Sequence, residues 1–149
     1  MPAVDVSTDI VVDRPVAQVA AYTCDPRNAP QWYANIRSVE LLTGEPVGVG
    51  SRMRFVAAFL GRRLDYTYEV VDLVPGERMV MSTAQGPFPM TTEYTFEAAG
   101  DARTLVGLRN HGTPSGFGAV AAPMMRAAIA RANTKDLAAL KAVLEARPG

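Results

Sequence analysis

The last third of the chain, from Thr113 to Glu145, constrains the fold more than any other segment. It is dominated by Ala, Met and Leu, and between Ala119 and Ile129 nearly every residue is apolar. A helix that is apolar on all sides must be covered on most of them. The chain from Val4 to His111 is instead predicted to form strands and turns, apart from one short helical insertion. The sequence therefore predicts a sheet wrapped around one helix, an arrangement that encloses a cavity for an apolar molecule as well as a core.

Length and charge exclude several classes of protein. A chain of 149 residues buries roughly two-thirds of its unfolded surface, which suits one domain spanning residues 1–149. Its 15 basic and 15 acidic residues cancel and form no polybasic run. A neutral chain of this kind has no field that gathers nucleic acid or an anionic membrane, so neither is predicted as a partner.

The remaining composition predicts a cytoplasmic protein without cofactors. The one cysteine, Cys24, cannot form an internal disulfide and has no Cys or His neighbour at metal-ligand spacing, so no metal or other cofactor is predicted. The first residues lack the basic start and apolar run of a signal peptide. The longest uncharged stretch, residues 110–125, is too short to span a bilayer, so no integral membrane segment is expected.

Alternating apolar and polar residues predict seven strands before the long helix. Helices are expected over residues 15–24 and 29–33, where Asp25-Pro26 separates the two. The strands are expected at residues 4–12, 36–42, 51–60, 63–74, 79–83, 90–97 and 102–111. In the last strand Val106, Leu108 and Asn110 are expected to point inward, because the other choice would place Arg109 inside.

Two turns set the predicted register of the central strands. Gly61-Arg62 suits a two-residue turn with Gly first, and Pro75-Gly76 suits the centre of a type II turn. The second turn sets Met81 opposite Val70. The first predicts the inward pairs Phe59–Leu64, Ala57–Tyr66, Phe55–Tyr68 and Met53–Val70, and the outward pairs Arg54–Glu69 and Ala58–Asp65.

The inner face of this sheet is rich in methionine and tyrosine. Methionine is the adaptable side chain of promiscuous apolar surfaces, and buried tyrosine hydroxyls need polar partners that a dry core rarely offers. Each of these residues could also be ordinary core, as Leu137, Leu140 and Leu144 are expected to be. The residues predicted to line a ligand cavity are Trp32, Phe55, Phe59, Tyr66, Tyr68, Met81, Met90, Tyr94, Asn110, Phe117, Met124 and Met125.

The chain resembles the START-like (SRPBCC) superfamily, in its polyketide cyclase/dehydrase and lipid-transport branch, from about Val4 to Leu144. The segments that carry the resemblance are Asp13-Arg14-Pro15-Val16 with Val19, Asp25-Pro26, Trp32-Tyr33, Gly48-Val49-Gly50-Ser51, Pro75-Gly76-Glu77-Arg78, Tyr94-Thr95-Phe96-Glu97 and Pro114-Ser115-Gly116-Phe117. The resemblance implies an α+β helix-grip (START/Bet v 1-like) fold. It also implies a ligand cavity between sheet and C-terminal helix, with its mouth formed by Trp32-Tyr33, residues 85–89 and residues 114–117.

Catalysis finds little support in the residues. His111 is the only histidine, no Ser or Cys has a nucleophile-elbow context, and no Gly-rich phosphate loop follows a strand, so no catalytic residue is predicted. Three functions stay open, because this fold hosts many. Non-catalytic binding or transport of a lipid, fatty acid, terpenoid or polyketide is favoured. The others are a polyketide aromatase/cyclase and a protein-interaction or toxin-like regulator, with a homodimer or a small protein as partner.

Overall fold

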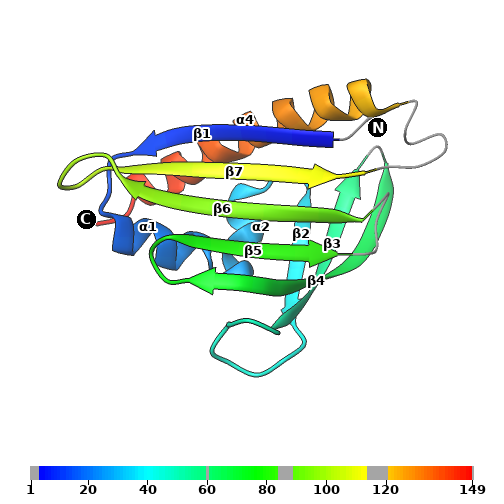
Figure 1. Ribbon diagram of the computed structural model, residues 1–149, viewed down its shortest axis with the longest axis horizontal. Helices are drawn as coiled ribbons and strands as arrows, with labels where there is room; N and C mark the ends of the chain where they lie inside the picture. The colour runs from blue at the N-terminus through cyan, green and yellow to red at the C-terminus, as the bar shows by residue number, and fades with distance from the viewer. Residues whose placement is uncertain (1–3, 60, 84–88, 114–120, 149) are drawn as a thin grey trace.

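A computed structural model describes residues 4–59, 61–83, 89–113 and 121–148. Seven antiparallel strands form one sheet in the order β1-β7-β6-β5-β4-β3-β2, and the helices lie together on one side of it (Figure 1). This arrangement confirms the predicted α+β helix-grip fold. The elements are β1 Val4–Val12, α1 Val16–Thr23, a 3-10 turn Pro26–Asn28, α2 Ala29–Trp32, β2 Ile36–Leu41, β3 Arg52–Phe59, β4 Arg62–Val74, β5 Arg78–Thr83, β6 Met90–Ala98, β7 Thr104–Gly112 and α4 Ala122–Glu145.

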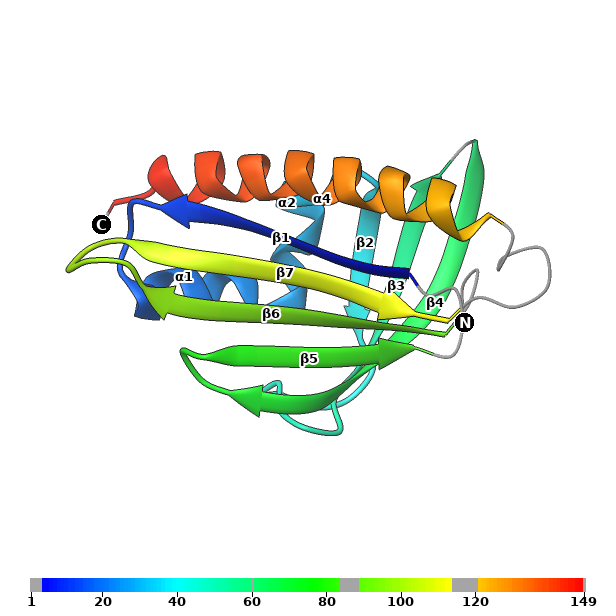
Figure 2. The same cartoon turned by 45° about the horizontal axis from the view of Figure 1, so that its top comes forward.

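Helix α4 runs along the sheet beside β1 and spans most of the length of the molecule (Figure 2). It packs against β1 and α2, while α1 lies against β6. None of the described helices is long and apolar enough to cross a membrane. The long helix was expected to begin near Thr113, but residues 114–120 lie outside the described part of the chain.

The predicted register of the β3–β4 hairpin is wrong by two residues. Phe59 pairs with Arg62, so Gly61, whose φ is +74°, is the second residue of the connection and not the first. Phe55 consequently pairs with Tyr66, and Arg54 with Thr67. The two faces nevertheless hold the expected residues, because side chains alternate with a period of two and a two-residue shift restores each to its own face.

The other register predictions are confirmed. Val70 pairs with Met81, and in the β4–β5 turn the Glu77 N–H donates to the Val74 carbonyl at 2.9 Å, with Gly76 at a φ of +78°. A shift in the ladder just before Asp72 leaves Val71 exposed. In β7 the alternate residues Val106, Leu108 and Asn110 are buried as expected.

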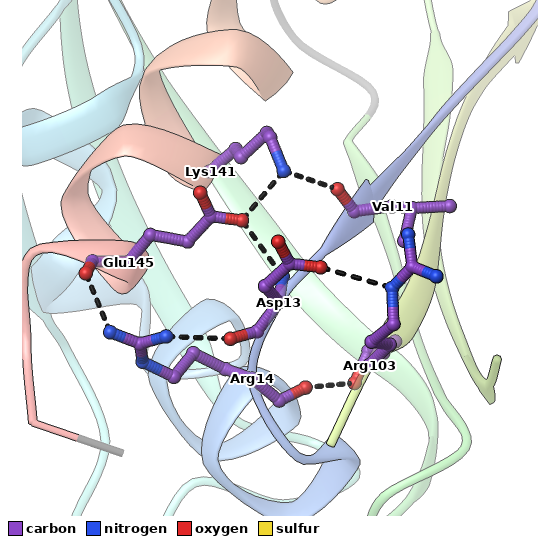
Figure 3. A network of polar contacts seen from close by, with 7 residues as sticks. Val11, Asp13, Arg14, Arg103, Lys141 and Glu145 are labelled. Carbon is purple, nitrogen blue, oxygen red and sulfur yellow. Dashed lines mark hydrogen bonds and ion pairs between the residues drawn. The ribbon is translucent and has the colours of Figure 1, made fainter. Parts of the chain in front are cut away.

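The C-terminal end of α4 is fixed by a polar network at the β1–α1 junction (Figure 3). The Arg14 guanidinium donates to the carbonyls of Glu145 at 2.6 Å and Arg147 at 2.7 Å. Lys141 Nζ donates to the Val11 carbonyl at 2.9 Å, and the Asp13 N–H donates to the Glu145 carboxylate at 2.8 Å. The last carbonyls of a helix lack intrahelical donors and carry partial negative charge, so a cation there satisfies both needs.

Candidate functional site

The concave face of the sheet, turned toward the helices, gathers five of the predicted ligand-binding residues. Phe55, Tyr68, Met81 and Tyr94 are buried in the main core cluster, and Tyr66 packs against it partly buried. The Phe55 and Tyr66 rings stack with centroids 6.0 Å apart, and the Tyr68 ring meets both edge-on. Pairing through β3 and β4 therefore builds one continuous aromatic wall.

A second aromatic group joins α2 to β6. Trp32 stacks on Tyr33 with centroids 4.0 Å apart and meets Tyr94 edge-on at 5.9 Å, while the hydroxyls of Tyr33 and Tyr94 are 2.6 Å apart. Burial raises the pKa of both tyrosines, so both hydroxyls keep their protons. Trp32 was expected near the mouth of a cavity, yet only 2% of it is exposed. It is part of the core because α2 presses it inward between the sheet and α4.

A chain of polar side chains crosses the interior from the sheet to the helix. The Tyr68 hydroxyl lies 3.2 Å from Thr92 Oγ1, which accepts a hydrogen bond from Asn110 Nδ2 at 2.8 Å. Asn133 Nδ2 of α4 donates to Asn110 Oδ1 at 2.7 Å. Asn110 was predicted in the site, but Asn133 was missed. The signal was its spacing of four residues before Leu137, which puts it on the buried stripe of the helix.

Asp136 is the one carboxylic acid buried on α4 among the described residues, with 5% of the residue exposed. Its Oδ1 accepts a hydrogen bond from the Ala34 N–H at 3.1 Å, which ties α4 to the end of α2. Desolvation raises the pKa of the carboxyl, partly offset by that hydrogen bond and by Lys135. Asp136 also lies close enough to Tyr33 to contribute to raising that tyrosine's pKa. A buried acid of raised pKa beside a phenol is typical of sites that move protons.

The predicted residues near the start of α4 do not join the aromatic wall. Met90 and Met125 lie partly buried against a second cluster formed by Val4, Val6 and Ala122. Met124 was predicted to line the cavity, but the structure turns it away from the core and leaves it 77% exposed. Phe117 and the side chain of Phe59 lie outside the described part of the molecule.

The only histidine of the chain lies outside this site, whereas the only cysteine, Cys24, packs partly buried against the same core cluster. His111 lies on the outer face of the sheet with Arg109, opposite Asp5 of β1. Burial raises the pKa of the Cys24 thiol to about 12, so it is not a thiolate at neutral pH. Among the described residues no group of His, Cys, Asp and Glu could hold a metal ion.

A groove of about 870 Å³ lies outside the predicted site. Its walls come from α1, the loop between β2 and β3, and the β4–β5 turn, and it contains none of the predicted ligand-binding residues. At one end the Arg27 guanidinium joins the carboxylates of Asp25 and Glu45, at 3.0 and 2.5 Å, so the loop is tied to the helical region. This groove lies between α1 and those two loops and shares no lining residue with the aromatic wall.

A model of the family described as "polyketide cyclase / dehydrase and lipid transport" matches residues 3–145 of the chain. A comparison with curated proteins finds no significant match. Solved structures of similar fold exist for several bacterial proteins.

The Zhui aromatase/cyclase from Streptomyces sp. R1128 is 20% identical, with a TM-score of 0.81 over 96% of this chain and 94% of the other. A START superfamily protein from Mycobacterium smegmatis is 17% identical, with a TM-score of 0.79 over 95% and 97% of the two chains. The di-domain aromatase/cyclase BexL is 21% identical, with a TM-score of 0.78 over 95% of this chain and 46% of that one. At these identities the likeness establishes the fold alone.

Proposed function

Because the chain belongs to the polyketide cyclase/dehydrase and lipid-transport family, we propose that it binds and carries a small hydrophobic molecule between the concave face of the sheet and α4. The class of ligand is a lipid, a fatty acid, a terpenoid or a polyketide. The aromatic wall of Phe55, Tyr66 and Tyr68 supplies the apolar contacts that such a ligand needs.

The observation that carries this proposal is the polar chain set into an otherwise apolar interior. Ligand sites are mostly apolar with a few placed polar groups that orient the ligand. The chain from Tyr68 to Asn133 offers hydroxyl and amide groups of this kind. Tyr66, next to Tyr68, has no hydrogen bond from its hydroxyl within the described residues, and burial raises its pKa, so it keeps a proton to donate.

Two measurements test the carrier function. Native mass spectrometry of the purified protein should reveal a co-purified apolar molecule, and a dye that fluoresces in apolar sites should bind the folded protein. Tyr94→Trp should weaken dye binding, since Tyr94 is buried against the site. Met124→Trp is the matched control, because Met124 points outward and its replacement should leave binding unchanged. Equal binding by both variants, with circular dichroism showing both folded, would contradict the proposed site.

A second function, cyclisation of a polyketide, is supported by one specific observation. Desolvation raises the pKa of the buried Asp136 carboxyl, and Asp136 lies close enough to Tyr33 to raise the pKa of that phenol, so the pair is the candidate group for exchanging protons with a ligand's carbonyl groups in the proposed site. Enolisation and ring closure of a polyketide need proton transfer at carbonyl and methylene groups. Asp136→Asn should then abolish turnover of a model poly-β-ketone while leaving dye binding intact. Unchanged turnover would remove Asp136 from any such reaction.

A further inference from the structure

The groove between α1, the β2–β3 loop and the β4–β5 turn plays no part in the carrier function. Figures 1 and 2 show α1 and the β4–β5 turn close together. On the α1 side Ala17, Ala21 and Cys24 are spaced by four and three residues, so they share one face of the helix. The opposite wall includes Val47 and Leu73. Because the side chains on the helix wall are short, a space of about 870 Å³ remains, which is large enough for a small organic molecule.

One end of this groove carries more negative than positive charge. Arg27 Nε and Nη2 donate to the two carboxylate oxygens of Asp25 at 3.0 and 3.2 Å, and Arg27 Nη1 lies 2.5 Å from Glu45 Oε1. One guanidinium is thus shared by two carboxylates, and Arg27 is the only cation among the described lining residues. The Cys24 thiol adds no charge at neutral pH, because burial raises its pKa to about 12. The groove is therefore left with one unbalanced negative charge.

Glu45 is the group through which a ligand can reach that charge. Its second carboxylate oxygen forms no ion pair or hydrogen bond with a described residue, whereas both oxygens of Asp25 already accept from Arg27. The Glu45 side chain is also the more exposed of the two, at 58% against 31%. A carboxylate oxygen of this kind accepts a charge-assisted hydrogen bond from an ammonium group.

We propose that this groove binds a small apolar amine, with its hydrocarbon part against Ala21 and Leu73 and its ammonium group on Glu45. Apolar walls with a few placed polar groups are typical of sites for small molecules. The apolar contacts supply most of the affinity, since they remove hydrocarbon from water. The charge selects among ligands of one shape, because a carboxylate in the place of the ammonium would be repelled by the unbalanced negative charge.

The groove differs in its chemistry from the candidate site on the concave face of the sheet. Burial there raises the pKa of Tyr33, Tyr66 and Tyr94, so these phenols keep protons that they can donate to a ligand. The free polar group of the groove is instead an acceptor. Ala20 and Cys24 line the groove and also pack in or against the main core cluster, so the two sites lie on either side of the same part of α1. The amine site is thus a second site with its own class of ligand.

Three compounds that share one apolar body test the proposal on the intact chain. Calorimetry at neutral pH and low salt should show that 4-phenylbutylamine binds more tightly than 4-phenylbutanol, and that 4-phenylbutanoate binds least. Ala21→Trp fills the groove from an exposed position and should lower the affinity for the amine about tenfold or more. Ala138→Trp is the matched control, because Ala138 is an exposed helical alanine that does not line the groove.

Glu45→Gln tests the charged contact, since it keeps the size of the side chain and removes the charge. It should lower the affinity for 4-phenylbutylamine about two- to fivefold and leave that for 4-phenylbutanol unchanged. Glu97→Gln is its control, because Glu97 is exposed on β6 outside the groove. Cys24 reports occupancy directly, as the only cysteine of the chain. The amine should slow its reaction with N-ethylmaleimide, and the same concentration of 4-phenylbutanoate should not.

The outcomes separate this site from the carrier function. The amine should leave apolar dye binding unchanged, and Tyr94→Trp should leave amine binding unchanged. Equal affinity for the amine and the carboxylate, or equal losses in Ala21→Trp and Ala138→Trp, would overturn the amine site and leave the carrier function standing. A folded Ala21→Trp variant that also lost dye binding would show that the two sites are one, and would overturn a separate amine site. A parent that binds the amine but no dye would support the groove and remove the carrier function.

Discussion

The two halves of α4 differ in what they contribute to the molecule. In the C-terminal half Leu137, Leu140 and Leu144 are at most 1% exposed and belong to the main core cluster. In the N-terminal half Met124 is exposed, and Met125 and Ile129 pack only partly buried against a small separate cluster. The half with the more apolar sequence is therefore the less buried one. An apolar segment has to be shielded from water, but a ligand, a membrane or the rest of the protein can each provide that shielding.

The polar contacts of α4 follow the same division. Its C-terminal end is bound by Arg14 and Lys141 to the β1–α1 junction, whereas its first residues have no side-chain cap. Asn133 and Asp136 mark the boundary, where the helix bonds to β7 and to the end of α2. One end of the helix is thus tied to the rest of the fold by side chains, whereas its N-cap has no side-chain hydrogen bond.

The sharpest test of this comparison removes one apolar side chain from each half. Leu140→Ala should lower the free energy of unfolding by about 2–5 kcal/mol, because it opens a cavity in a fully buried position. Met124→Ala should change it by less than about 0.5 kcal/mol, as expected for an exposed side chain. Urea denaturation followed by circular dichroism measures both. A similar loss in the two variants would show that the halves are equally packed.

The next largest effect should come from the polar network at the C-terminal end. Arg14→Ala removes the guanidinium that binds the carbonyls of Glu145 and Arg147, which should cost about 1.5–3 kcal/mol for charged hydrogen bonds. Hydrogen exchange should show faster opening in the last turns of α4 and unchanged exchange near Met125. If both ends opened faster together, the two halves of the helix would form a single cooperative unit.

Most of the fold follows from patterns that a sequence can carry. Alternation assigns the inward residues of β7, and the Pro75-Gly76 turn fixes Val70 against Met81. Alternation could not fix the β3–β4 register, because a two-residue shift leaves each face unchanged and Gly61 fits either turn position. The sequence thus assigns each face correctly but leaves this pairing ambiguous.

The candidate site was only partly predictable because it depends on tertiary orientation. The wall of Phe55, Tyr66 and Tyr68 lies on one face of two paired strands, which the pattern predicts. Met124 was placed wrongly because a helix that is apolar on all sides gives no indication of which side faces the core. Asn133 and Asp136 were missed because the buried stripe of the helix was defined by its leucines alone, although both residues also lie on it.

The smallest expected effect concerns Asp136, at the boundary between the two halves, and its sign depends on pH. Burial raises the pKa of this carboxyl in the folded protein, so the unfolded chain loses the proton first. Its contribution to stability is therefore complete below the unfolded pKa, about 3.9, and declines as pH rises through the folded pKa. Asp136→Asn keeps an oxygen to accept from the Ala34 N–H and carries no charge. The variant should match the parent in acid and become the more stable of the two as pH rises.

Asp5→Asn is the matched control for that change, since the hydrogen bond from Arg109 lowers the pKa of Asp5. A lowered pKa gives stability that is present above the unfolded pKa and lost in acid, so this variant should become the less stable one as pH rises. Urea midpoints at several values between about pH 2 and pH 8 separate the two signs, because the Asp5 effect develops below the unfolded pKa and the Asp136 effect above it. If Asp136→Asn instead lost stability at every pH, the carboxylate would be held by a partner strong enough to offset its burial. The boundary of α4 would then stabilise the fold as the C-terminal half does.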